Sequence, residues 1–310
     1  MTTRKFYSGN KVEVKFDCDG TIEKEISHPQ DSLIMPLASV SKWFIALAIG
    51  SLVEKGELQF NDSIERFLPS FPNAKKIKII DLLRHTSGLT EIYDHPYFVQ
   101  RVGSEYVSAM DVSQLLVEIA SNADHSESAF AFNYSNSNYI LLGEVVLKAV
   151  GVTLAQVVRT KVFAPLGMLT AQIGWSGEAK AFPTRSFLAE ISGPTDFLEH
   201  ECFKQLHFDE HFYDGNILVT SDDILAFFQA GCGQSLMSQK TWSALVDPGE
   251  NDSNYACGIR VLRSSNGPVF WHTGFWLGFQ TGLAFCTAGT RGLFSFDKCF
   301  DPNDPRAFAR

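Results

Sequence analysis

Apolar and polar positions alternate near both ends of the chain and follow a helical spacing in the middle. Residues 12–16 alternate between apolar and charged side chains, and Asp19-Gly20 supplies a turn, so residues 3–27 are predicted to form a β-hairpin. After Asn254 the segments are short, bounded by glycine and rich in β-branched or aromatic residues. They are predicted to be sequential antiparallel strands over 254–263, 268–272, 278–286 and 291–296.

The middle of the chain is predicted to be mostly helical. The segment from Ser39 to Lys55 is rich in alanine, leucine and isoleucine, contains no proline and is followed by Gly56, which favours a helix end. We expect this helix to be buried. Residues 221–223 are a favourable N-cap cluster for a helix that reaches Ala230. Further helical segments, separated by prolines, are 62–68, 77–85, 111–121, 136–150 and 153–163.

Strands at both ends with helices between them predict an α+β fold. The simplest arrangement is one antiparallel sheet built from both termini, with an all-helical lobe inserted. We expect a single catalytic domain over 1–310, with a sheet lobe of about 1–60 plus 212–310 and a helical lobe of about 61–211. The two lobes are expected to meet at a cleft, where small ligands usually bind.

Composition excludes several classes of function. The chain has 310 residues, of which 45% are hydrophobic and 20% charged, as expected of a globular protein with a sizeable core. Its net charge of −9 repels polyphosphates, so no nucleic-acid partner is expected. The longest apolar stretch, Trp43 to Val53, is about eleven residues long and too short to span a bilayer.

The N-terminus and the cysteines bear on the compartment. No apolar segment follows the early basic residues, so a cytoplasmic location is expected, or a periplasmic or secreted one if a signal has been removed. The six cysteines form no C-x-x-C pair, and we expect free thiols in a reducing compartment. They lie at positions 18, 202, 232, 257, 286 and 299.

Candidate nucleophiles are found through the S-x-x-K pattern, since no G-x-S-x-G elbow is present. The pattern occurs three times, at Ser8/Lys11, Ser39/Lys42 and Ser295/Lys298. Only Ser39 opens a long apolar helix, where Lys42 three residues later lies on the same face. The dipole at a helix N-terminus also favours developing negative charge. Taken alone, this segment is better explained by an N-cap serine followed by a surface lysine in the first turn.

Two further triplets have candidate chemistry. The triplet Y-S-N at 134–136 precedes a predicted helix, where a phenol and a carboxamide can be presented side by side. The triplet H-T-G at 272–274 ends a predicted strand, and its glycine permits a close approach by a ligand or another backbone. Each has a plain structural explanation, namely a turn with a capping asparagine and an ordinary strand end.

In combination the three motifs resemble those of the serine β-lactamase/penicillin-binding-protein superfamily. They follow one another at intervals of 95 and 138 residues. The closest likeness is to the class C β-lactamase-like branch, which includes DD-carboxypeptidases, D-aminopeptidases and esterases. The resemblance runs from about residue 10 to about residue 290, and the supporting stretches are 38–44, 81–89, 132–139 and 214–223.

The resemblance implies a serine hydrolase that forms an acyl-enzyme with esters, D-amino-acid amides or peptides, or β-lactams. It implies a β-lactamase/transpeptidase-like fold, with an antiparallel sheet flanked by helices beside an all-helical lobe. Ser39 would be the nucleophile and Lys42 its base. Tyr134 would pass a proton to the leaving group, and Asn136 would bind a substrate amide. No cofactor and no metal are implied.

The same resemblance assigns the H-T-G segment to substrate binding, through His272, Thr273 and Gly274. The backbone N–H groups of Ser39 and Phe275 would form the oxyanion hole. His272 takes the place of a lysine found in many β-lactamases, and an imidazole with an ordinary pKa of about 6.5 is only partly charged at neutral pH. Esters and D-amino-acid amides are therefore expected to react faster than penicillins or cephalosporins.

One departure and two alternatives accompany this interpretation. Residues 287–310 do not have the pattern of the terminal strand and long amphipathic helix with which the family usually ends. A catalytically weak or inactive binding protein is therefore one alternative. The other is a metal hydrolase, although its candidate ligands do not match H-E-x-x-H. Those ligands are His200, His207, Asp209 and His211. A small-molecule partner is expected, and the sequence leaves the oligomeric state open.

Overall fold

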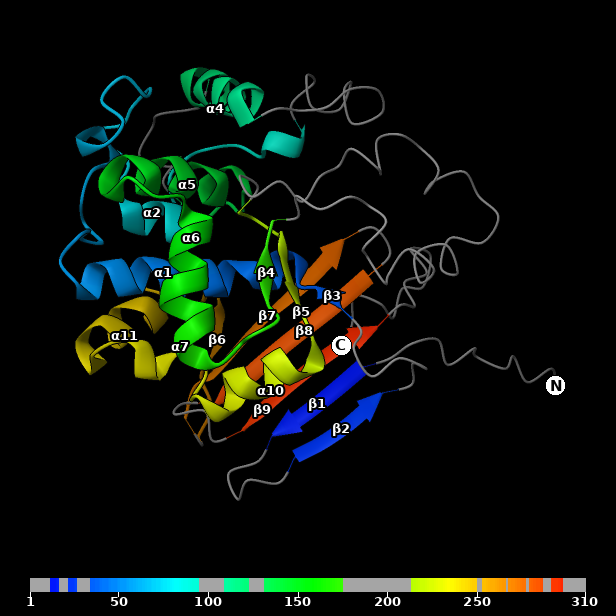
Figure 1. Ribbon diagram of the computed structural model, residues 1–310. Coiled ribbons are helices and arrows are strands. Elements are labelled where there is room, and N and C mark those ends of the chain that lie inside the picture. Colours follow the sequence, from blue (N-terminus) through cyan, green and yellow to red (C-terminus); the bar gives the residue numbers. More distant parts are fainter. Residues whose placement is uncertain are drawn as a thin grey trace, which may run out of the picture.

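The computed structural model describes ten segments of the chain. They are residues 12–16, 22–26, 34–94, 109–122, 131–174, 213–249, 253–265, 267–276, 279–286 and 291–297. Within them, helices pack on an antiparallel sheet, as Figure 1 shows. The predicted α+β architecture is confirmed.

The main sheet joins strands from the two ends of the chain. Its strands are β1 (Val12–Phe16), β2 (Ile22–Ile26), β6 (Arg260–Leu262), β7 (Val269–Trp276), β8 (Phe279–Cys286) and β9 (Gly292–Asp297). Their order is β2-β1-β9-β8-β7-β6, and every neighbouring pair is antiparallel. The predicted hairpin and the predicted C-terminal strands are confirmed, although β6 is shorter than the expected 254–263. The strand β9 also corrects the expectation that residues 287–310 lack a terminal strand.

One face of this sheet is buried against helices. The alternation of the strands turns the side chains of Phe270, Leu283 and Phe294 toward the core, where all are buried. The helix α1 (Ser41–Glu54) packs on this face, and the rings of Trp43 and Phe285 have centroids 5.7 Å apart. Such aromatic contacts account for a large share of the buried apolar area.

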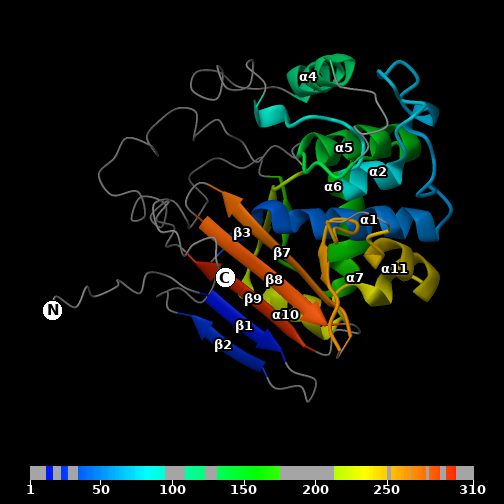
Figure 2. The same cartoon turned by 180° about the vertical axis from the view of Figure 1, so that it is seen from behind.

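The helix α1 lies at the centre of the molecule. Every side chain from residue 41 to residue 52 is buried, as the apolar composition predicts. Figures 1 and 2 both show α1 between the main sheet and the helices α2, α4 and α5. The helices besides α1 are α2 (Ile79–Arg84), α4 (Ala109–Asn122), α5 (Ser137–Val150), α6 (Leu154–Val158), α7 (Ala164–Leu166), α10 (Ser221–Gln229) and α11 (Gln239–Val246).

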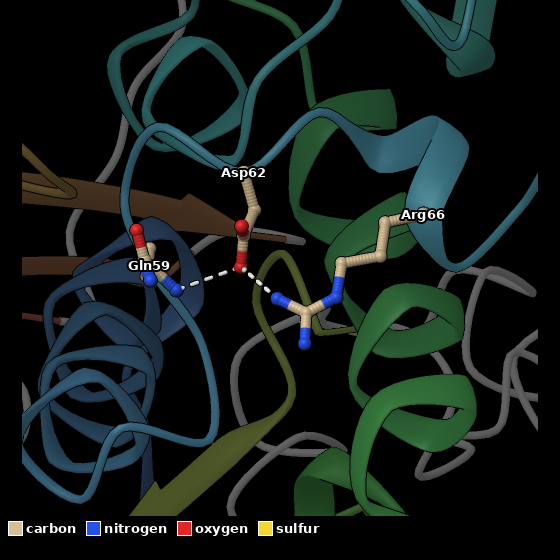
Figure 3. A network of polar contacts seen from close by, with 3 residues as sticks. All are labelled: Gln59, Asp62 and Arg66. Carbon is tan, nitrogen blue, oxygen red and sulfur yellow. Dashed lines mark hydrogen bonds and ion pairs between the residues drawn. The ribbon is translucent and has the colours of Figure 1, made fainter.

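Short turns of other helix types complete the secondary structure. Those in the 3-10 conformation are η1 (Ala38–Val40), η2 (Ile64–Arg66), η3 (Ile92–Asp94) and η7 (Gln234–Leu236), and η5 (Arg159–Phe163) is a π-helix. The loop before η2 is held by Asp62, whose Oδ2 accepts the N–H of Gln59 at 2.9 Å and Nη1 of Arg66 at 3.0 Å (Figure 3). The predicted helices 62–68 and 153–163 therefore appear in shorter or mixed form.

A second, three-stranded sheet leads the chain into η1. Its strands are β3 (Met35–Pro36), β4 (Gln172–Ile173) and β5 (Ile217–Val219), in the order β3-β5-β4. Met35 pairs with Val219, and the N–H of Leu37 donates to the carbonyl of Ile217 at 2.9 Å. This sheet brings the segment before Ser39 beside the segment that begins at residue 213.

The caps of α10 explain where that helix begins. Thr220 is the N-cap, and its hydroxyl accepts the N–H of Asp223, whose carboxylate accepts the N–H of Thr220. The N-cap is therefore Thr220 rather than a member of the predicted cluster 221–223, and the helix begins at Ser221. Within the described ranges no single helix is long and apolar enough to cross a bilayer, although the bent pair Ser137–Val150 and Leu154–Leu166 reaches that length and composition together.

Candidate active site

Ser39 lies in η1, immediately before α1, rather than at the first residue of the helix. Its neighbour Ala38 has a φ of 47°, in the left-handed region that an alanine rarely adopts. This turn is pressed against β7, because a Cβ added to Gly274 would lie 2.3 Å from the carbonyl oxygen of Leu37. Thr281 on β8 donates to the same carbonyl at 2.8 Å. Tertiary contacts thus fix the strained turn that presents Ser39.

Lys42 is fully buried in the first turn of α1. Its Nζ lies 3.2 Å from Ser39 Oγ and 2.7 Å from Asn136 Oδ1. The main-chain oxygen of Asp214 lies 2.6 Å from the same nitrogen. Two of these partners are carbonyl oxygens that can only accept, so the amine donates to both, whereas the third is a hydroxyl that can also donate.

Tyr134 lies beside this amine. Lys42 Nζ is 5.2 Å from the centroid of the phenol ring. The Tyr134 hydroxyl is buried and has no hydrogen-bond partner among the described residues. A buried donor without a partner is unfavourable. The hydroxyl therefore has a hydrogen-bonding capacity that the described residues do not use.

Asn136 is oriented by a residue that sequence reasoning missed. Glu91 Oε2 accepts the Asn136 Nδ2 at 3.0 Å and the Asn136 backbone N–H at 2.8 Å. The amide nitrogen is thus turned toward Glu91, which leaves Oδ1 facing Lys42. Glu91 lies just beyond the motif stretch 81–89, so its place in the chain gave only a weak signal. The expected contact of Asn136 with a substrate amide stays a prediction.

Asp214 is a second carboxyl group that the sequence did not single out for chemistry. It is buried, and its Oδ2 accepts the hydroxyl of Tyr93 at 3.0 Å. Burial raises the pKa of Asp214 to about 6, with Lys42 opposing the rise and Glu91 adding to it. Burial also raises the pKa of Tyr93 well above its usual range.

His272 is buried on β7 and is expected to be neutral. Its Nδ1 lies 2.6 Å from the carbonyl of Thr273, which can only accept, so Nδ1 carries the proton. Its Nε2 then accepts the hydroxyl of Tyr255 at 3.0 Å. Burial lowers the pKa of His272 to about 3, and the nearby charge of Lys42 adds to the effect. The expectation of a partly charged imidazole is therefore corrected.

The remaining residues of the H-T-G segment have different surroundings. Thr273 is exposed, and its side chain makes no hydrogen bond to the part of the chain that the structure describes. Gly274 adjoins the Ser39 turn, so Ser39 and Phe275 lie on adjacent segments. β6 pairs with residues 269–271 of β7, before the H-T-G segment. The oxyanion hole formed by the two backbone N–H groups stays a prediction.

Arg260 is a cation near this segment that sequence reasoning also missed. Its guanidinium lies 5.4 Å from the ring centroid of Tyr255 and 5.6 Å from that of Trp271. It forms no ion pair with any residue in the described segments. Arg260 lies near this segment because β6 pairs with β7, which follows it after a loop. No local sequence motif marks Arg260 for this position.

The predicted catalytic residues thus converge, and no alternative cluster is visible in the described segments. The ring centroids of Tyr134 and His272 are 6.3 Å apart, so the Y-S-N and H-T-G segments adjoin. Within the same segments, no group of three or more potential ligands is arranged to hold a metal ion. The four candidate metal ligands from the sequence, His200, His207, Asp209 and His211, lie outside the described residues. Cys232, Cys257 and Cys286 are free thiols.

Comparison with known proteins gives a consistent result. The profile of the family described as Beta-lactamase matches residues 22–306. Penicillin-binding protein 4* of Bacillus subtilis is 28% identical over 263 residues, which cover 80% of this chain and 57% of that protein. Teichoic acid D-alanine hydrolase of Staphylococcus aureus is 22% identical over 202 residues, covering 65% of this chain and 46% of the relative. The chain thus spans about half the length of the curated relatives it matches.

Among solved structures, a D-stereospecific amidohydrolase from Streptomyces sp. superposes with a TM-score of 0.74. The two chains are 20% identical, and the match covers 93% of this chain and 89% of the other. At this identity the likeness concerns the fold. It agrees with a sheet built from both termini beside a helical region.

Proposed function

The chain belongs to the Beta-lactamase family, and from this premise we propose that it is a serine hydrolase whose nucleophile is Ser39. The observation that supports the proposal most strongly is the position of Lys42. Its buried amine lies 3.2 Å from Ser39 Oγ, with its other two contacts directed to oxygens that only accept. A serine hydroxyl becomes a good nucleophile when a neighbour accepts its proton.

In the proposed reaction Ser39 Oγ attacks the substrate carbonyl carbon while Lys42 takes the serine proton. The carbonyl π electrons move to its oxygen, where the N–H groups of Ser39 and Phe275 stabilise the charge, at about 3 kcal/mol for each donor. The bond to the leaving group then breaks, and Tyr134 passes a proton to that group. Water attacks the resulting ester in the reverse sense, which releases the acid and restores Ser39.

We propose short D-amino-acid amides and esters as the substrate class. The printed names of the relatives support this choice, since they include a D-alanine hydrolase and a D-stereospecific amidohydrolase. The neutral His272 supports it too, because it supplies no positive charge for the carboxylate of a β-lactam. A substrate carboxylate would have to be held by Arg260 instead.

The proposal is tested by covalent labelling. A fluorophosphonate should add one adduct to the peptide that contains Ser39, and the Ser39→Ala variant should not be labelled. Ser295→Ala is the matched control, because Ser295 belongs to another S-x-x-K pattern on β9, and it should be labelled as the wild type is. Labelling that persists in Ser39→Ala would contradict the assignment.

Turnover with a small panel then separates the substrate classes. D-Alanine amide and p-nitrophenyl esters are expected to be hydrolysed faster than benzylpenicillin. Labelling of Ser39 without turnover of any of them would favour a binding protein over an enzyme. Faster turnover of a cephalosporin than of the esters would overturn the proposed substrate class.

A further inference from the structure

His85 lies behind Tyr134, at the C-cap of α2. It is 1% exposed and adopts a left-handed backbone conformation with a φ of 59°. Its carbonyl oxygen accepts the N–H of Asn133 at 2.9 Å. The main chain of His85 therefore holds the residue that immediately precedes Tyr134.

The His85 imidazole holds the residue that follows Tyr134. Nδ1 accepts the backbone N–H of Ser135 at 3.2 Å and lies 3.2 Å from Nδ2 of Asn138. The second hydrogen of this Nδ2 is directed to the carbonyl of Ser135 at 3.1 Å. Because Nδ1 accepts, the imidazole proton is on Nε2. Burial lowers the pKa of His85 well below its usual value, and the nearby charge of Lys42 lowers it further.

The imidazole also contacts the phenol ring itself. The ring centroids of His85 and Tyr134 are 4.3 Å apart, with the planes tilted by 35°. The buried Nε2 of His85 has no hydrogen-bond partner among the described residues, and neither has the Tyr134 hydroxyl. Tyr255 and Tyr139 surround the imidazole, with ring centroids at 4.9 Å and 5.3 Å. The imidazole therefore has little freedom to move away from the phenol.

We propose that His85 is a positioning residue for Tyr134. It accepts a hydrogen bond from the residue on each side of Tyr134 and packs against the phenol, so that the phenol ring stays beside Lys42. The inference rests on the proposed function, because the position of the phenol affects the reaction only if Tyr134 transfers a proton. His85 itself touches no reacting atom.

A double-mutant cycle distinguishes positioning from a purely structural role. A purely structural role predicts the same loss of acylation rate with and without the Tyr134 hydroxyl. His85→Phe keeps an aromatic ring but removes the Nδ1 acceptor. His85→Asn keeps an acceptor near the position of Nδ1, tolerates the left-handed backbone and removes the ring. Each variant is made in the wild type and in Tyr134→Phe, and acylation by a p-nitrophenyl ester is followed in single turnovers.

We expect His85→Phe to lower the acylation rate by about 10–100-fold in the wild type, because small displacements of reacting groups have effects of this size. In Tyr134→Phe the same change should have less than about a three-fold effect, since the hydroxyl is already absent. KM should change little in both backgrounds. His85→Asn should recover a large part of the lost rate, because the hydrogen bond from Ser135 is retained.

The control is Ser87→Ala. Ser87 donates to Asn138 and accepts the N–H of Leu89, so it stabilises the same loop without a contact to the phenol. Any loss it causes should be equal in the two backgrounds. An equal loss for His85→Phe in both backgrounds would overturn the inference, as would an unchanged acylation rate in the wild type. If His85→Phe does not fold, His85→Gly replaces it under the same criterion, because glycine tolerates the left-handed backbone and removes both the acceptor and the ring.

The two proposals fail in different ways. An unchanged acylation rate in Tyr134→Phe alone would contradict the role of Tyr134 in the proposed function. A strong effect of Tyr134→Phe combined with additive effects of the His85 variants would contradict only the positioning role.

Discussion

Adding one methyl group at Gly274 tests whether the contact between β7 and the Ser39 turn sustains catalysis. In Gly274→Ala the new Cβ would lie 2.3 Å from the carbonyl oxygen of Leu37 and 2.4 Å from Oγ1 of Thr281. It would also lie 3.0 Å from the Cβ of Ala38. The nearest contact would be between the new Cβ, which is fixed to the backbone of β7, and the backbone oxygen of Leu37. No flexible side chain can therefore move to relieve it.

The size of the effect follows from this overlap. A separation of 2.3 Å is about 1 Å short of van der Waals contact, so β7 and η1 must move apart by a similar distance. Overpacking of this kind lowers the free energy of unfolding by about 1–3 kcal/mol. The backbone N–H groups of Ser39 and Phe275 would then be misaligned by about 1 Å. This misalignment should lower the acylation rate about 100-fold.

A neighbouring glycine supplies the matched control. Gly282 lies on β8 opposite Thr273, and a Cβ there would meet only the end of the Ser295 side chain, at 2.9 Å. Gly282→Ala should therefore change stability and acylation little. Both variants are compared by thermal unfolding and by the single-turnover release of p-nitrophenol from p-nitrophenyl acetate.

Two results would refute the reasoning. If Gly274→Ala acylates within about three-fold of the wild type, the spacing between β7 and the Ser39 turn does not control the reaction. If Gly282→Ala loses as much activity as Gly274→Ala, the effect belongs to the sheet as a whole rather than to this contact.

Three further predictions concern the groups around Ser39. Lys42→Ala and Tyr134→Phe should each lower turnover by about 10²–10⁴-fold and together by much less than the product, whereas independent losses would contradict a shared proton transfer. Asp214→Asn should raise the melting temperature at pH 8 but not at pH 4. Because the pKa of Asp214 is raised from its ordinary value of 3.8 to about 6 in the native protein, the stabilising contribution of this carboxyl is lost as pH rises from 3.8 through about 6, an effect of up to about 3 kcal/mol. A variant less stable than the wild type at pH 8 would contradict this. Arg260→Ala should raise KM for peptides with a free carboxylate but not for uncharged esters. Arg263→Ala, at an exposed position nearby, should leave both KM values unchanged. An equal rise in KM for both substrate types would argue against carboxylate binding at Arg260.

The sequence was most informative where chemistry depends on short motifs. Ser39 and Lys42 are three residues apart across the junction of η1 and α1, and helical spacing brings their side chains into contact. The sheet built from both termini also followed from the strand pattern and was confirmed. The start of α1 was less predictable, because the approach of Gly274 on a distant strand sets the conformation at Ala38.

What the sequence could not reveal depends on burial and on contacts across long intervals. The charge of His272 follows from its enclosure, which a motif does not encode. Glu91, Asp214 and Arg260 reach the site through tertiary contacts, and no local spacing marks them. The proposed role of His85 has the same origin, although it lies in a stretch that supported the family resemblance. The division into two lobes at residues 60 and 211 stays a prediction.

The support of the Ser39 turn from β8 has a consequence for protein synthesis. The hydrogen bond from Thr281 to the carbonyl of Leu37 joins residues 244 positions apart. A ribosome therefore releases α1, with its largely apolar surface, long before the strands that cover it exist. Chains that depend on such distant contacts fold slowly and expose aggregation-prone surface in the meantime. The nascent protein should accordingly need protection by a chaperone until β7 and β8 have emerged, and only then can Ser39 adopt its reactive geometry.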